Sequence, residues 1–86
     1  MCYNIPMSEI NELIKMYAFF DHSKIIPIAF SWQGRRYEKL KQISSWEMRR
    51  GQYLDQWFSL SDGVNTYHVR FNGVEHNWRL MEILTD

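Results

Sequence analysis

Cysteine is nearly absent from this sequence, and its scarcity excludes two kinds of site. Cys2 is the only cysteine, so neither an internal disulfide nor a metal site built from cysteines can form. A lone thiol is typical of a reducing compartment. No secretory signal opens the chain, and no apolar run approaches the roughly 20 residues of a membrane helix. We therefore expect a cytoplasmic protein that does not bind a membrane.

The sequence also lacks net charge and catalytic motifs. Its ten basic and ten acidic residues cancel, so the whole-chain field attracts neither nucleic acid nor a membrane. No P-loop, GxGxxG, GxSxG or HExxH motif occurs. A chain of 86 residues has room for one core only. We predict a single domain over residues 1–86 with no enzymatic activity and no cofactor.

Aromatic residues, in contrast, are abundant. They make up 16% of the chain, and hydrophobic residues make up 45%, a composition that indicates a folded domain. Some of these side chains are expected to face a partner or a second copy of the chain. Charge is also uneven, because residues 35–50 hold six basic and two acidic residues. A solvated basic surface and a site for an anionic partner are both consistent with this local excess.

The segment over residues 25–46 has the clearest organisation. Apolar residues alternate through residues 25–32, which predicts a strand with one buried face. Gln33-Gly34 suits a two-residue hairpin turn because glycine accepts a positive φ. That turn pairs Phe30 with Tyr37, a favourable cross-strand aromatic contact. Pro27 donates no backbone hydrogen bond, so one flank of its strand is expected to be an edge.

Beyond this hairpin the alternation is interrupted. Lys39 would face Ile28, which is a poor pair, and Leu40 has the wrong parity for the inner face, whereas Ile43 has the right one. A β-bulge near residues 38–39 would bring Leu40 inward and bend the strand.

The aromatic and turn residues of this segment follow a P-x-x-F-x-W-x-G-R-x-Y…I-x-x-W pattern. It comprises Pro27, Phe30, Trp32, Gly34, Arg35, Tyr37, Ile43 and Trp46. The pattern resembles a family of small, uncharacterised bacterial β-domains. Members of that family stand alone or are appended to proteins related to Y-family DNA polymerases. The resemblance covers about residues 14–84, with Tyr67 and residues 78–80 fitting it loosely, and it implies a β-domain but no particular activity.

The N-terminal region has two readings. Residues 1–12 are expected to be irregular or to form a short helical turn, and the apolar spacing over residues 8–16 suits either a helix or a strand. We prefer a strand over residues 13–20, with Ile14, Met16, Ala18 and Phe20 on one face, because a connection of four residues leads to the next strand and suits a hairpin. The β core is then predicted over residues 13–84.

Two glycine turns organise the C-terminal half. Strands are predicted over residues 52–61, 64–71 and 74–84, joined by Asp62-Gly63 and Asn72-Gly73, which are strong hairpin signals. Treated as two-residue turns, these fix the register and hence the faces of the sheet. The predicted inner face comprises Leu54, Phe58, Leu60, Tyr67, Val69, Phe71, Val74, Trp78 and Leu80. The predicted outer face comprises Asp55, Trp57, Ser59, Thr66, His68, Arg70, Glu75, Asn77 and Arg79.

Polar side chains on these strands do not form a recognisable catalytic site. The register places His68 and His76 on opposite faces, so they cannot share an ion, and we expect no metal site. Asp55 and Glu75 share a face with Arg70 between them, which predicts a ladder of ion pairs rather than two carboxylates poised for acid–base chemistry.

These elements together predict an all-β fold. An antiparallel meander of about six strands must close or pair to bury one face. We expect a small SH3-like or Sm-like barrel or half-barrel. A half-open sheet that dimerises is the alternative.

Such small barrels bind single-stranded nucleic acid by stacking bases on exposed aromatic side chains beside basic ones. The first candidate surface comprises Trp32, Arg35, Arg36, Trp46, Arg49 and Arg50. The second comprises Trp57, His68, Asn77 and Arg79. Alternatively, Trp32 and Trp46 belong to the core, the arginines cover it, and Trp57 contacts another copy. We therefore predict a non-catalytic module that binds single-stranded or structured nucleic acid through the basic and aromatic region 32–50, with protein–protein interaction or homo-oligomerisation as the alternative.

Overall fold

The computed structural model describes residues 10–22 and 24–85, and these form a single curled antiparallel sheet. Its strands are β1 (Glu12–Asp21), β2 (Lys24–Trp32), β3 (Arg35–Tyr37), β4 (Lys41–Arg50), β5 (Tyr53–Ser61), β6 (Asn65–Phe71) and β7 (Trp78–Thr85). They lie in the order β3-β2-β1-β7-β6-β5-β4. The prediction of an all-β, barrel-like fold is confirmed. The described residues contain no helix long and apolar enough to cross a membrane.

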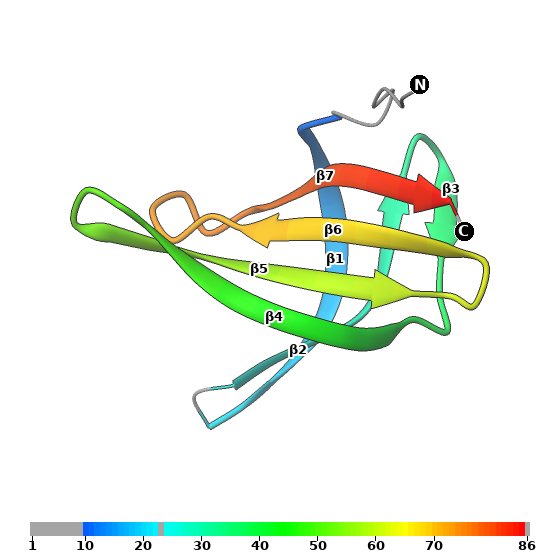
Figure 1. Ribbon diagram of the computed structural model, residues 1–86, viewed down its shortest axis with the longest axis horizontal. Coiled ribbons are helices and arrows are strands. Elements are labelled where there is room, and N and C mark those ends of the chain that lie inside the picture. The colour runs from blue at the N-terminus through cyan, green and yellow to red at the C-terminus, as the bar shows by residue number, and fades with distance from the viewer. Residues whose placement is uncertain (1–9, 23, 86) are drawn as a thin grey trace, which may run out of the picture.

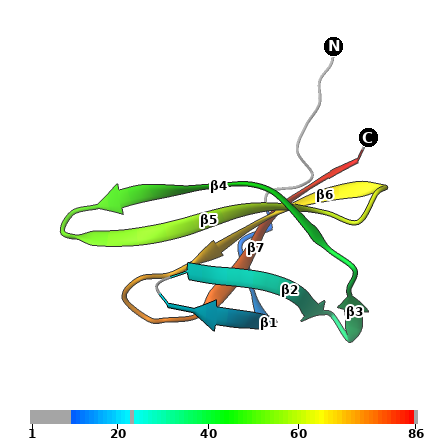
Figure 2. The same cartoon turned by 90° about the horizontal axis from the view of Figure 1, so that it is seen from below.

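The sheet folds over on itself into two layers. Strands β4 to β7 lie side by side, and β1 to β3 cross behind them (Figure 1). Turned by 90°, the two layers face each other, while β2 and β4 run separately at the two margins (Figure 2). The sheet is therefore a half-barrel with an open side, since its order leaves β4 at one end and β3, paired to β2 over three residues only, at the other.

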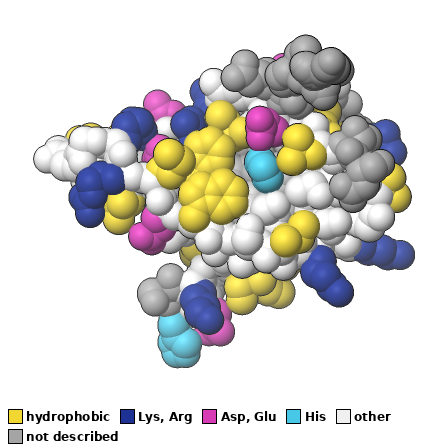
Figure 3. Space-filling view, viewed as in Figure 1, with side chains coloured by type: hydrophobic (Ala, Val, Ile, Leu, Met, Phe, Trp, Pro, Cys, Tyr) yellow, Lys and Arg dark blue, Asp and Glu magenta, His cyan; other side chains and the backbone are white. Residues whose placement is uncertain are grey.

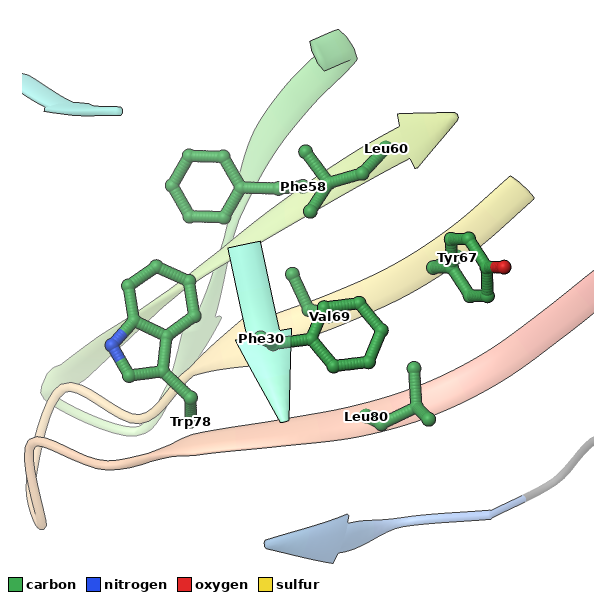
Figure 4. Close-up of a cluster of buried hydrophobic side chains, with 7 residues drawn as sticks. All are labelled: Phe30, Phe58, Leu60, Tyr67, Val69, Trp78 and Leu80. Carbon is green, nitrogen blue, oxygen red and sulfur yellow. The ribbon is translucent and has the colours of Figure 1, made fainter. Parts of the chain in front are cut away.

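The core fills the space between the layers. Its buried side chains come from β2, β5, β6 and β7 (Figure 4). They are Phe30, Phe58, Leu60, Tyr67, Val69, Trp78 and Leu80. Burying each of the larger apolar side chains contributes about 1.5–3 kcal/mol, so this cluster is the main source of stability. Six of these seven residues lie on the inner face that the sequence predicts.

The predicted β2–β3 hairpin is confirmed in its register. Gln33 and Gly34 have φ angles of 52° and 75°, as a primed two-residue turn requires. The rings of Phe30 and Tyr37 stack with centroids 4.8 Å apart. Pro27 lies where β3 no longer pairs with β2, so the expected edge is also confirmed.

The chain then departs from the prediction between β3 and β4. Instead of a bulge near residues 38–39, strand β3 ends at Tyr37 and Lys39 takes a φ of 59°. This bend brings Leu40 against the core, as the bulge was expected to do. The irregularity lies later, between Gln42 and Ser44. Ile43 is consequently 59% exposed rather than on the inner face.

The Asp62-Gly63 connection is longer than predicted, because Ser61 pairs with Thr66 and leaves four residues in the loop. The Asp62 carboxylate holds this loop by accepting hydrogen bonds from Val64 N, Asn65 N and the Tyr67 hydroxyl at 2.9, 2.8 and 2.8 Å. These bonds hold the pKa of Asp62 below its usual value, those from the two backbone N–H groups contributing most, while burial raises the pKa of Tyr67.

The Asn72-Gly73 connection is longer still. Phe71 pairs with Trp78, so residues 74–77 belong to a loop and the strand predicted there is wrong. Asn72 Oδ1 accepts the N–H groups of Val74 and Glu75 at 2.7 and 2.9 Å, which makes an Asx turn in place of a two-residue reversal.

Both errors in register leave the predicted faces largely intact. Each shifts the pairing by an even number of residues, and side chains alternate with a period of two. Tyr67 and Val69 are therefore buried as expected. The exceptions are Leu54 and Val74, which are predicted core residues but are 41% and 43% exposed, and Asp55 and Ser59, which are predicted on the outer face but are buried.

The preference for a strand near the N-terminus is also confirmed, since β1 spans Glu12–Asp21. Ile14, Met16 and Ala18 pack against the core, but Phe20 is 66% exposed because it lies near the end of the β1–β2 hairpin, beyond the body. The expectation for residues 1–9 lies outside the described residues.

Candidate nucleic-acid interface

Two tryptophans stack on the outer face of the sheet. Trp46 of β4 is the cross-strand partner of Trp57 of β5, and their rings lie 6.0 Å apart with planes inclined by 17°. The ring of His68, on β6, lies nearly perpendicular to that of Trp46, with ring centroids 5.8 Å apart. A patch of hydrophobic side chains with a histidine beside it occupies the middle of this face (Figure 3).

Basic side chains lie beside the tryptophans. The Arg70 guanidinium is 6.0 Å from the Trp57 ring, and Arg70 pairs across the strands with Arg79. Like charges directly opposite each other are unfavourable. Neither arginine forms a salt bridge within the part of the chain that is described; Arg79 Nη1 donates to the backbone oxygen of Asn11 at 3.0 Å. We name Trp46, Trp57, His68, Arg70 and Arg79 the tryptophan face.

His68 is fixed by an acidic neighbour. Its Nδ1 lies 2.8 Å from Glu82 Oε1, and Glu82 is the cross-strand partner of His68 on β7. The contact sets the orientation of the imidazole beside Trp46. One carboxylate therefore borders the tryptophan face.

The first part of the first predicted surface lies elsewhere, at the β2–β3 turn. Trp32 Nε1 donates to Glu12 Oε1 at 2.8 Å. Arg35 lies over the Tyr37 ring at 5.3 Å, and Arg36 lies over the Tyr17 ring at 4.5 Å. These cation–π contacts tie both arginines to the body of the molecule.

The second part lies at the far end of β4. Arg50 Nε and Nη2 donate to the two carboxylate oxygens of Asp55 at 2.9 and 3.1 Å. Asp55, although buried, also accepts the Gly73 N–H at 3.0 Å. The Arg50 bonds are the largest cause of a pKa of Asp55 below its usual value. Arg49 is exposed.

The first predicted set therefore does not form one site, since the β2–β3 turn and the far end of β4 lie at opposite ends of the molecule (Figure 1). The structure instead brings Trp46 to Trp57 and His68 of the second set, while Arg79 lies further along the same face, opposite Arg70. Asn77 lies in the loop before β7, where its side chain donates to Glu75 Oε1 at 3.1 Å.

Arg70 was missed as a site residue because the predicted ladder paired it with Asp55 and Glu75. That ladder is wrong, since Asp55 binds Arg50 instead. The longer β6–β7 loop sets Arg79 opposite Arg70. Predicting this pairing would have required the correct length of that loop, because the loop length sets the register of β6 and β7.

An open cleft lies on the other side of the tryptophans, between the margins of the half-barrel. It has a volume of about 770 Å³ and is bordered by β2, β4 and β5. Its lining residues are Lys24, Ile25, Ile26, Gln42, Ser45, Trp46, Glu47, Gln56 and Phe58. Glu47 is the single carboxylate among them, so the cleft offers no pair of acids. Among the described residues, no group of three or more His, Cys, Asp or Glu is placed to hold a metal ion.

Comparison with known proteins adds no relative. No family model matches the chain, and neither a curated protein nor a solved structure matches it.

Proposed function

We propose that this protein is a non-catalytic module that binds single-stranded nucleic acid on the tryptophan face. The observation that carries the proposal is the pairing of Arg70 with Arg79 beside two stacked tryptophans. A backbone phosphate is attracted to each guanidinium, that of Arg70 beside Trp57 and that of Arg79 beside Asn11.

The residues have distinct roles in this proposal. Trp46 is 38% exposed and offers its ring to a base, while Trp57 supports that ring from behind. Base stacking on an aromatic side chain is worth about 1–3 kcal/mol per base. Arg70 and Arg79 bind the backbone phosphates, and His68 borders the stacked base. Binding of this kind tolerates any sequence, because every base has a face that stacks.

A fluorescence-anisotropy titration with a labelled single-stranded oligonucleotide of mixed sequence, at several salt concentrations, tests the proposal. We expect Trp46→Leu to weaken binding by roughly 5- to 150-fold, the equivalent of one lost stacking contact. Arg70→Ala combined with Arg79→Ala should weaken binding and flatten the salt dependence by about 1.4 in log–log slope, as the loss of two phosphate contacts implies.

The matched control is Arg35→Ala combined with Arg36→Ala, which removes the same charge from the β2–β3 turn. It should change affinity by less than about threefold, since long-range charge effects are screened. The proposal is overturned if the wild-type protein does not bind at tens of micromolar. It is equally overturned if the control pair abolishes binding while the tryptophan-face variants bind normally, which would place the site at the turn.

Association with another protein is a second candidate function, favoured by the free end of the β1–β2 hairpin. Phe19 and Phe20 are each 66% exposed there, and Ile26 is 41% exposed. Adjacent apolar side chains exposed to this degree are typical of interaction surfaces. Phe19→Ser combined with Phe20→Ser should leave the fold intact and abolish capture of such a partner. The SH3-like or Sm-like identity of the half-barrel, a bacterial source and a cytoplasmic location are also parts of what we propose.

A further inference from the structure

Strand β4 is an edge strand with an unusual exposure. It has β5 on one side and no neighbour on the other within the described chain. All ten of its residues are exposed. An edge of this length presents a row of unpaired N–H and C=O groups that can pair with another strand.

The β4–β5 turn shows which backbone groups are free. Arg50 pairs with Tyr53 across the two-residue turn at Gly51 and Gln52, and residues flanking such a turn direct their N–H and C=O groups at each other. Because the direction alternates along an antiparallel strand, Arg49 and Glu47 direct their groups outward.

Charge selects one register for pairing β4 with a second copy of itself. Centring an antiparallel pair on Glu47 or on Arg49 sets that residue opposite its own copy, so like charges meet. Centring on Met48 sets Glu47 opposite the partner's Arg49 at two symmetric places. Centres nearer the start of β4 run into the irregularity beside Ile43.

We propose that two copies of this chain form a symmetric dimer through antiparallel pairing of their β4 edges, centred on Met48. This end of the β4–β5 hairpin projects from the body (Figure 1), so a second hairpin has room to approach. Met48 is 51% exposed here, and its own copy on the partner strand would cover it. Zero net charge removes long-range repulsion between copies.

A charge-swap experiment followed by sedimentation equilibrium tests the register. The wild-type chain should dimerise with a dissociation constant in the micromolar range, as the small interface implies. Glu47→Arg or Arg49→Glu alone should raise that constant about tenfold or more, because each sets like charges opposite at two places. The double variant should restore dimerisation. Lys24→Glu, a charge reversal on β2, is the matched control and should change nothing.

Cross-linking tests the centre of the pair. In a Cys2→Ser background, Met48→Cys should form a disulfide-linked dimer under mild oxidation. Opposite residues of a non-hydrogen-bonded pair have Cα atoms about 4.5 Å apart, a separation that a disulfide spans. Ile43→Cys, at a position on the same strand that is even more exposed, should form little cross-linked dimer.

A strict monomer at all concentrations overturns the proposal, and so does a dimer unaffected by the single charge reversals, which would place the interface on another surface. The dimer does not depend on nucleic-acid binding. Glu47→Arg should break the dimer, whereas the added positive charge should strengthen oligonucleotide binding. The two proposals therefore respond in opposite directions to one variant, and failure of one is distinguishable from failure of the other.

Discussion

Strands β4 and β6 belong to the same sheet but differ in what surrounds them. Strand β6 has neighbours on both edges and buries Tyr67 and Val69. Strand β4 has one neighbour and buries no side chain. Both carry aromatic residues, so residue type alone does not separate them; the number of neighbouring strands does. Core packing explains the aromatic residues of β6, whereas Trp46 contributes little to the core and is free to bind.

The comparison implies that shortening a side chain lowers the free energy of unfolding far more in the core than on β4. A substitution in the core should show the largest loss. Leu60 is fully buried, and Leu60→Ala should lower the free energy of unfolding by about 2–5 kcal/mol, the usual cost of losing a buried side chain and leaving a cavity. Ile43→Ala on β4 should cost less than about 0.5 kcal/mol. Urea denaturation of both variants measures the difference. Equal losses would mean that β4 is covered.

The Asp55 carboxylate on β5 binds Arg50 of β4 and the Gly73 N–H of the β6–β7 loop. Its removal should therefore have an intermediate effect on stability. Asp55→Ala leaves the Gly73 N–H without its acceptor and removes the partner of Arg50. We expect a loss of about 1–3 kcal/mol, the penalty for an unsatisfied buried group. Arg50→Ala should cost less, because Asp55 keeps its bond from Gly73. Denaturation curves that rank the two variants in the opposite order would contradict this account.

Acid should produce a smaller and graded loss. The pKa values of Asp55 and Asp62 lie below the ordinary 3.8 in the folded state. A lowered folded-state pKa adds stability above the unfolded value and loses it as pH falls through the folded value. The melting temperature should therefore decline below about pH 4. Asp62→Asn keeps an oxygen for the loop N–H groups but cannot ionise, so its decline should be shallower. An identical decline would exclude Asp62 as a contributor.

Sequence reasoning was most successful where a signal is local. The glycine at position 34 and the alternation around Phe30 predicted the β2–β3 hairpin with its register. The predicted lengths of the other two turns were wrong. The side chains of Asp62 and Asn72 accept hydrogen bonds from their own loops and so stabilise longer connections, and an Asp-Gly or Asn-Gly pair can begin loops of several lengths. The inner face nevertheless survived, since even shifts preserve side-chain alternation.

The candidate site was harder to predict, because it depends on which strands lie together. Trp46 and Trp57 meet through the β4–β5 pairing, which the sequence did not indicate. Arg79 meets Arg70 only because the β6–β7 loop is four residues longer than a two-residue turn. Sequence proximity within residues 32–50 suggested one basic surface, but the sheet order separates its two halves.

The most direct test of the tryptophan face is to observe each indole N–H by nuclear magnetic resonance during titration with a single-stranded oligonucleotide. The four tryptophans give separate signals that single substitutions assign. The account predicts that the signals of Trp46 and Trp57 shift, while those of Trp32 and the buried Trp78 stay in place. Shifts confined to Trp32, or no shift of any indole, would contradict it.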